Sequence, residues 1–169
     1  MDVADDAIFT YLRQIAPARW TFDDFSAYID SLVRRPGWHF LAMVQRDTGR
    51  PVGLSSYNDI RPEHRGLEIG STWIGRAFQG TNVNPEAKYL MLRHAFEDWD
   101  AIRVQLKTDR RNLRSRRAIE KLGAVREGIL RKHMLLPDGY QRDSVMYSIT
   151  DDEWPDVRER LVARLGYVP

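Results

Sequence analysis

Two stretches near the start of the chain carry apolar residues at the three- and four-residue spacing of a helix. The first consists of Ile8, Tyr11, Leu12 and Ile15, and the second of Phe22, Phe25, Tyr28, Ile29 and Leu32. Pro17 separates the two stretches, and Pro36-Gly37 ends the second. The pattern predicts two helices between Asp5 and Val33, the second with Thr21 or Asp23 as its N-cap.

The spacing then changes to that of strands. Apolar residues alternate or run together over Trp38–Gln45, Pro51–Asn58 and Leu67–Ile74. Asp47-Thr48-Gly49 lies between the first two runs and favours a tight antiparallel turn. A polar loop, residues 61–66, precedes the third run. We therefore expect a three-stranded antiparallel meander.

A helical pattern returns over Pro85–Trp99 and is followed by an alternating strand, Ile102–Lys107. A strand, a helix and a strand in this order predict a right-handed crossover. Such a crossover places Leu67–Ile74 and Ile102–Lys107 parallel to each other in one sheet.

The last third of the chain predicts a short helix, Asn112–Leu122, with Gly123 as the left-handed residue after its last turn. Two strands near Gly128–Leu136 and Ser144–Ile149 follow, and a helix from Asp151 to about Leu165 closes the chain. No linker or repeat interrupts the pattern. The sequence predicts a single α/β domain over residues 1–169 with a mixed sheet.

Composition narrows the possible chemistry. There is no cysteine among the 169 residues, which excludes disulfides, thiolate metal ligands and a thiol nucleophile. The four histidines lack ligand spacing, so we expect no metal. No apolar run reaches the length of a membrane span, and the first residues are acidic where a signal peptide is basic. These features favour a soluble, cytoplasmic protein.

The net charge of +2 is unevenly distributed. Residues 1–30 carry two basic and six acidic side chains, whereas residues 103–121 carry eight basic and two acidic ones. Five arginines dominate the basic segment: Arg110, Arg111, Arg114, Arg116 and Arg117. They could bind cofactor phosphates, an acidic protein surface or RNA, although a solvated helix face is the commonest explanation of such a run.

The turn Gln79–Asn84 leads into the helix that follows it, with Asn84 as the expected N-cap and Pro85 as the first helical residue. Free N–H groups and the helix dipole make such a start suitable for phosphate, although an ordinary connection has the same features. No Gly-Lys-Ser/Thr follows, the glycines do not match the dinucleotide fingerprint, and residues 53–57 lack the second glycine of a nucleophile elbow. Kinase, dehydrogenase and esterase chemistry are therefore disfavoured.

The order of these motifs resembles the GNAT superfamily of acetyl-CoA-dependent N-acetyltransferases, and most closely the RimJ/RimL type, which acetylates N-terminal amino groups of ribosomal proteins. The resemblance covers nearly the whole chain and rests on Leu67–Ile74, Gln79–Ala87, Thr108-Asp109 with Asn112 and Ser115, Glu120–Ala124, Glu127-Gly128 with Leu130-Arg131, Asp138-Gly139 with Arg142-Asp143, and Glu153-Trp154.

The resemblance implies a three-layer fold whose central, splayed, mostly antiparallel sheet is flanked by helices. It also implies acetyl-CoA as the cofactor, an amine as the acceptor, and a possible homodimer. The acceptor would be a protein N-terminus or a small molecule, without a membrane, and with nucleic acid only through the ribosome. Members of the family usually begin with a strand, whereas this chain is expected to begin with a helix.

The resemblance further implies a set of cofactor-binding residues: Trp73, Ile74, Gln79, Gly80, Thr81, Asn82, Val83, Asn84, Asn112, Arg111 and Arg117. Asn82 and Asn84 stand where the family has small residues in its phosphate loop. Because Asn tolerates left-handed backbone, the loop can keep its shape, but the two side chains narrow the approach of a pyrophosphate.

Glu68 is the candidate base for the attacking amine, since an apolar cleft would give its carboxyl the necessary proton affinity; a surface or ion-paired carboxylate is the alternative. Ser115 matches the family's serine near the thiol, and a helix first-turn serine that serves the backbone is its alternative. Four residues are candidates for substrate binding: Tyr57, Asp138, Arg142 and Asp143.

The leading hypothesis is therefore an N-acetyltransferase that uses a carboxylate base for direct attack by a primary amine. Two alternatives remain open. One is a CoA-binding protein without turnover, motivated by Asn82. The other is an RNA- or ribosome-associated binding protein that acts through the basic segment, although that segment lacks interleaved aromatic residues.

Overall fold

The computed structural model describes residues 6–12, 15–17, 19 and 21–167. Its helical elements are η1 (Asp6–Phe9), α1 (Phe22–Val33), η3 (Pro62–His64), η4 (Arg76–Phe78), α2 (Val83–Arg93), the π-helical turn η5 (His94–Asp98), α3 (Leu113–Lys121) and α4 (Trp154–Leu165). Its strands are β1 (Trp38–Val44), β2 (Pro51–Arg61), β3 (Gly66–Ile74), β4 (Arg103–Asp109), β5 (Val125–Leu135) and β6 (Gln141–Thr150).

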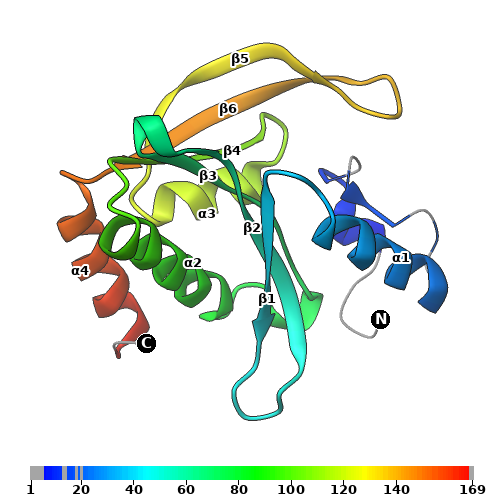
Figure 1. Cartoon of the computed structure of the whole chain (residues 1–169), viewed down its shortest axis with the longest axis horizontal. Helices are drawn as coiled ribbons and strands as arrows, with labels where there is room; N and C mark the ends of the chain where they lie inside the picture. Colours follow the sequence, from blue (N-terminus) through cyan, green and yellow to red (C-terminus); the bar gives the residue numbers. More distant parts are fainter. Residues whose placement is uncertain (1–5, 13–14, 18, 20, 168–169) are drawn as a thin grey trace.

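The strands of the described chain form one sheet in the order β1-β2-β3-β4-β6-β5. Every neighbouring pair is antiparallel except β3 and β4, which are parallel and joined by α2 (Figure 1). The predicted meander, crossover and final hairpin are confirmed, and each strand end lies within three residues of its prediction. Gly49 and Gly139, the glycines of the two predicted hairpin turns, both have positive φ, a conformation that glycine adopts at little cost.

Of the two N-terminal helices predicted, α1 is confirmed, with Thr21 Oγ1 accepting from the backbone of Asp24 at 3.2 Å. The first is wrong as an α-helix over the described residues, since only 3₁₀-helical residues occur there, the four of η1 and Ile15. Phe9 and Ile15 are both buried in one cluster. Six residues apart on a helix they would point in different directions, so an irregular chain is needed to bury both. Asp5 and residues 13–14 lie outside the described residues.

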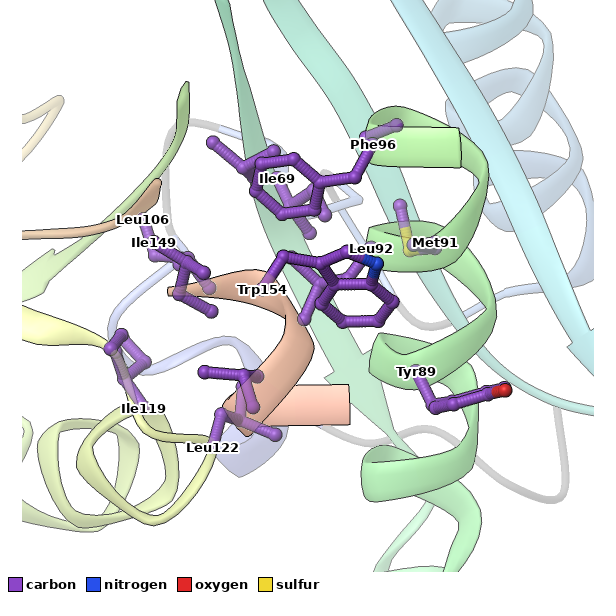
Figure 2. Packing of buried hydrophobic residues seen from close by; sticks show 14 of the residues in the cluster. Ile69, Tyr89, Met91, Leu92, Phe96, Leu106, Ile119, Leu122, Ile149 and Trp154 are labelled. Atoms are coloured by element: carbon purple, nitrogen blue, oxygen red, sulfur yellow. The ribbon is translucent and has the colours of Figure 1, made fainter. Parts of the chain in front are cut away.

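The helices divide between the two faces of the sheet and give the expected three layers. The core under α2, α3 and α4 contains Leu92 and Phe96, with Trp154 of α4 stacked on Phe96 at 5.4 Å between ring centroids (Figure 2). Truncating a buried Trp of this kind costs roughly 3–5 kcal/mol. α1 lies on the other side of the sheet from α2 (Figure 1), where α1 and η1 pack against Trp73 and Leu54.

The parallel pairing of β3 with β4 is short. Only Gly66, Leu67 and Glu68 pair, with Arg103, Val104 and Gln105 respectively. β3 then continues to Ile74 and β4 to Asp109 without further pairing between them. The sheet therefore opens beyond Glu68, which confirms the expected splay.

Candidate active site

A cleft of about 320 Å³ fills the opening between β3 and β4. Residues 69–74 of β3 and 106–108 of β4 form its walls. Residues 7, 8 and 10–12 around η1 close it on one side of the sheet, and residues of α2 and α3 close it on the other. The cleft therefore passes through the sheet, so that two ligands entering from opposite faces would meet between the strands.

β3 is irregular where it borders the cleft. Ser71 has φ +51°, and the register with β2 shifts between Leu54 and Ser56. A bulge of this kind re-aims the residues beside it, and a non-glycine residue in left-handed backbone is costly enough to be concentrated at functional sites. Trp73 and Ile74, two of the residues predicted to bind the cofactor, follow the bulge and line the cleft.

The turn before α2 differs from its prediction in detail. α2 begins at Val83, so Asn82 occupies the N-cap position and neither Asn84 nor Pro85 has its predicted place. The reason is Thr81, whose hydroxyl donates to the carbonyl of Phe78 at 2.7 Å and accepts from the N–H of Val83 at 3.3 Å. This side chain caps the helix two residues earlier than Asn84 would.

Gly80, not an asparagine, supplies the left-handed residue of the turn, with φ +80°. Asn82 is exposed, has right-handed backbone and makes no capping bond. Gln79, Gly80 and Asn84 line the cleft, whereas Thr81, Asn82 and Val83 do not. Asn82 therefore leaves the loop shape intact and stands outside the cleft wall.

The start of α3 faces this turn across the cleft. Asn112 caps α3 by accepting from the N–H of Ser115 at 3.0 Å, and both residues line the cleft. The Ser115 hydroxyl makes no hydrogen bond with any described residue. Arg114 donates to the side-chain oxygen of Gln79, which joins α3 to the turn. The capped start of α3 thus holds Ser115 in place, and its hydroxyl is free to contact a ligand.

The basic segment is mostly bound within the chain. Arg111 donates to both oxygens of Asp109, at 3.1 and 3.0 Å, and lies over the ring of Tyr140, 3.4 Å from its centroid. Neither Arg111 nor the exposed Arg117 lines the cleft, whereas Arg114 does. The other internal contacts of the segment are Arg110 with Asp143 and Arg116 with the carbonyl of Arg110. Most guanidinium groups of the segment thus already have a partner within the chain.

Glu68 is the last residue of β3 paired with β4, and its side chain is 3% exposed. Its Oε2 accepts from Lys107 Nζ at 2.5 Å and from Gln105 Nε2 at 3.0 Å. Oε1 accepts from no described residue and lies beside Gly70, where a Cβ would come within 2.9 Å of it. The surroundings are therefore a polar pair, not the apolar cleft that the sequence suggested.

Of the candidate substrate-binding residues, only Arg142 lines the cleft. Tyr57 lies in the core under α2 and donates to the carbonyl of Met91 at 2.8 Å. Asp138 accepts from the N–H of Tyr140 within the β5–β6 turn, and Asp143 accepts from the N–H of Lys132. Turn and strand contacts thus account for three of the four, and the guanidinium of Arg142, which only donates, suits an anion better than an ammonium.

Lys88 is a cleft residue that the sequence analysis missed. It is 4% exposed, and its Nζ donates to the hydroxyls of Ser55 at 2.8 Å and Thr72 at 2.6 Å, with no carboxylate partner among the described residues. Burial lowers its pKa from 10.5 to about 7. The sequence feature that could have identified Lys88 is its position on the otherwise apolar face of α2, which packs against the sheet.

Two negative findings apply to the described part of the chain. None of its helices is both long and apolar enough to cross a membrane. Nor do three or more His, Asp or Glu side chains gather anywhere in it as ligands for a metal ion.

Comparison with known proteins places these features in context. Residues 3–125 match the family described as "Acetyltransferase (GNAT) domain". Over 106 residues the chain is 30% identical to the Bacillus subtilis (strain 168) protein named "Putative ribosomal N-acetyltransferase YdaF", which covers 63% of this chain and 57% of that protein. The match thus spans little more than half the length of that relative.

Solved structures are similar over a larger share. A crystal structure described as a "putative acetyltransferase" from T. thermophilus has a TM-score of 0.88 at 45% identity, covering 96% of this chain and 84% of that chain. A GCN5-related N-acetyltransferase from Brucella melitensis has a TM-score of 0.87 at 29% identity, covering 94% of this chain and 70% of that chain.

Proposed function

Because the chain belongs to the GNAT family of acetyltransferases, which move an acetyl group from acetyl-CoA to an amine, we propose that the cleft between β3 and β4 carries out this transfer on a primary amine. The amine enters from the face of the sheet covered by η1. The acceptor is a protein N-terminal amino group or a small amine. The printed name of the relative YdaF supports the first of these.

The residues around the cleft fit acetyl-CoA. The backbone N–H groups of Gly80, Thr81 and Asn82 donate to no group in the part of the chain that the structure describes. A Cβ added at Gly80 would meet nothing within 4 Å, so the turn is open to a ligand. Unpaired N–H groups at a helix start bind phosphate, and Arg114 adds a positive charge on the cleft wall. This turn would hold the pyrophosphate.

The remaining chemistry is the movement of two protons. Acetyl-CoA supplies the acetyl thioester when bound; the attacking amine must lose a proton and the departing sulfur must gain one. Lys107 and Gln105 occupy Oε2 of Glu68, which leaves Oε1 to accept the proton from the amine. The unbonded hydroxyl of Ser115 on the opposite wall donates toward the sulfur.

The observation that carries the proposal is the position of Glu68: its carboxylate is fixed through one oxygen at the point where the strands part, and its other oxygen accepts no hydrogen bond from the described chain. The test is acetyl transfer from acetyl-CoA to a panel of N-terminal peptides and small amines, with thiol release as the readout. We expect transfer to at least one amine that depends on Glu68.

Two results would contradict the proposal in different ways. Binding of acetyl-CoA without transfer to any amine would favour the non-catalytic CoA-binding alternative. Failure to bind acetyl-CoA at all would show that the turn before α2 is an ordinary connection.

A further inference from the structure

Three cations and two carboxylates from β3, β4, β6 and the residues just after β4 gather on the η1 face of the sheet. Glu68 is paired with Lys107, and Asp109 is paired with Arg111 through both of its oxygens. Arg142 is the third cation and has no such partner among the described residues. Since each carboxylate is already bound, Arg142 adds a positive charge that nearby groups only partly offset.

Burial makes this charge costly. Arg142 is 5% exposed, and its Nε is buried without a hydrogen-bond partner. Burial lowers the pKa of the guanidinium, and Asp109 only partly offsets that effect. An arginine nevertheless stays charged in a protein. Two residues along the same face of β6, the Ser144 hydroxyl is also buried without a partner. An unpaired buried charge lowers the stability of the folded protein. An anion that binds Arg142 would therefore restore the stability that burying this charge costs.

The position of Arg142 shows which ligand can supply the anion. It lines the cleft together with Tyr11 and Lys107 on the η1 face. The turn before α2, with its unpaired N–H groups, belongs to the opposite face. His133 does not supply the anion, because an imidazole side chain carries no negative charge; burial first, and then Lys107 and Arg142, lower its pKa.

We infer that Arg142 binds a carboxylate of the amine acceptor, an inference that rests on the acetyl transfer proposed above. A guanidinium can take both oxygens of a carboxylate in a fixed orientation, which would also orient the amine. The carboxylate is either the α-carboxylate of a free amino acid or an acidic side chain next to the N-terminus of a polypeptide. Both place a negative charge a few bonds from the attacking nitrogen.

Matched acceptors test the inference and separate the two sources. One pair is L-serine and L-serinamide; the other is the peptide amides Ser-Glu-Ala and Ser-Gln-Ala. We expect kcat/KM to be about tenfold or more higher for the carboxylate member of one pair, as for a hydrogen bond to a charged group. The pair that shows the preference identifies the source.

Variants then connect the preference to Arg142. Arg142→Met should abolish it mainly by raising KM for the carboxylate acceptor, with the neutral acceptor unchanged within about threefold. Arg142→Lys keeps the positive charge but lacks the planar guanidinium, so it should retain part of the preference for the carboxylate acceptor. Arg131→Met, at an exposed position on β5, is the matched control and should keep the full preference.

Three kinetic results would overturn the inference: no preference in either pair, an equal loss with all four acceptors, or a raised KM for acetyl-CoA in Arg142→Met. If the wild type acetylates none of them, the same four probes are titrated by calorimetry without acetyl-CoA. Tighter binding of a carboxylate probe that Arg142→Met loses would keep the subsite, while acetyl transfer itself is decided by the wider panel of amines. Equal binding of both members of each pair would overturn the subsite.

Discussion

Lys107 Nζ lies 2.5 Å from Glu68 Oε2 at the point where β3 and β4 separate. Glu68 is the last residue of the parallel ladder, and Lys107 is two residues beyond its pairing partner Gln105. The ion pair therefore spans the first step of the opening. It fixes one carboxylate oxygen and leaves the other beside Gly70, which lines the cleft, whereas Glu68 itself lies behind the lining residues.

Replacing this carboxylate tests its role as the base. We expect Glu68→Gln to lower kcat by about 100-fold or more, as loss of a general base does, and to leave acetyl-CoA affinity within about twofold. Steady-state kinetics and calorimetry measure the two effects. The control is Glu127→Gln, since Glu127 is bound by Arg103 and Ser148 outside the cleft. An unchanged kcat in Glu68→Gln would mean that another group takes the proton.

Gly70 tests the placement of the same carboxylate without changing it. A Cβ at this position would lie 2.9 Å from Glu68 Oε1 and 3.1 Å from Asn58 Oδ1, so Gly70→Ala must displace the Glu68 oxygen and press on the Asn58 side chain. Because the displaced atom ends a flexible side chain, stability should change little while kcat falls by roughly tenfold. Gly128→Ala is the matched control, since nothing lies within 4 Å of its added Cβ. Equal kcat values for the two variants would contradict the assignment of Oε1.

Two arginines of α3 distinguish the cleft wall from the outer face. Arg114 lines the cleft and bonds to Gln79, whereas Arg117 is exposed and outside it. We expect Arg114→Met to weaken acetyl-CoA binding by about tenfold, the loss of one charge-assisted contact, and Arg117→Met to change it less than twofold. Calorimetry with acetyl-CoA measures both. The reverse order would restore the phosphate contacts suggested by the sequence.

Lys88 should make stability depend on pH. Its pKa is lowered from 10.5 to about 7 by burial, so between these values the unfolded chain holds a proton that the folded chain lacks. The free energy of unfolding should then rise with pH in this range, by at most about 1.4 kcal/mol per unit.

Lys88→Met removes this dependence. The free energy of unfolding of the variant should exceed that of the wild type most at or below pH 7. At pH 9 the difference between the two should be smaller by roughly 1–2 kcal/mol. Chemical denaturation at the two pH values measures it. Lys121→Met, at an exposed position, should parallel the wild type. If Lys88→Met also parallels the wild type, Lys88 is not buried in its neutral form.

The strands were predictable because their signals are local. Alternation at Arg103–Asp109 and the glycines at the hairpin turns require no knowledge of distant residues. The opening of the sheet after Glu68 was accessible only through the resemblance to a family. The length of the parallel pairing does not affect the alternation of apolar and polar residues within either strand.

The differences between the predicted and the observed site arise where one side chain competes with another. Asn84 is a good N-cap by type, but the Thr81 hydroxyl reaches the helix start first. Arg111 is as basic as Arg114, but Asp109, two residues earlier, already binds it. The second competition was visible in the sequence as an Asp and an Arg at a spacing of two. The neutralising environment of Lys88 was not, because Ser55 and Thr72 come from other elements.

The short ladder has a mechanical consequence. Only three residue pairs join β1–β3 to β4–β6 in the sheet. Beyond them, β3 and β4 do not pair with each other. A cofactor chain with amide groups of its own would fit this space as an additional strand. We expect acetyl-CoA to slow amide hydrogen exchange at residues 69–74 and 106–109 and to leave the outer strands β1 and β5 unaffected. The donor would then complete the sheet before it reacts, and the two halves would be most rigid when the acceptor arrives.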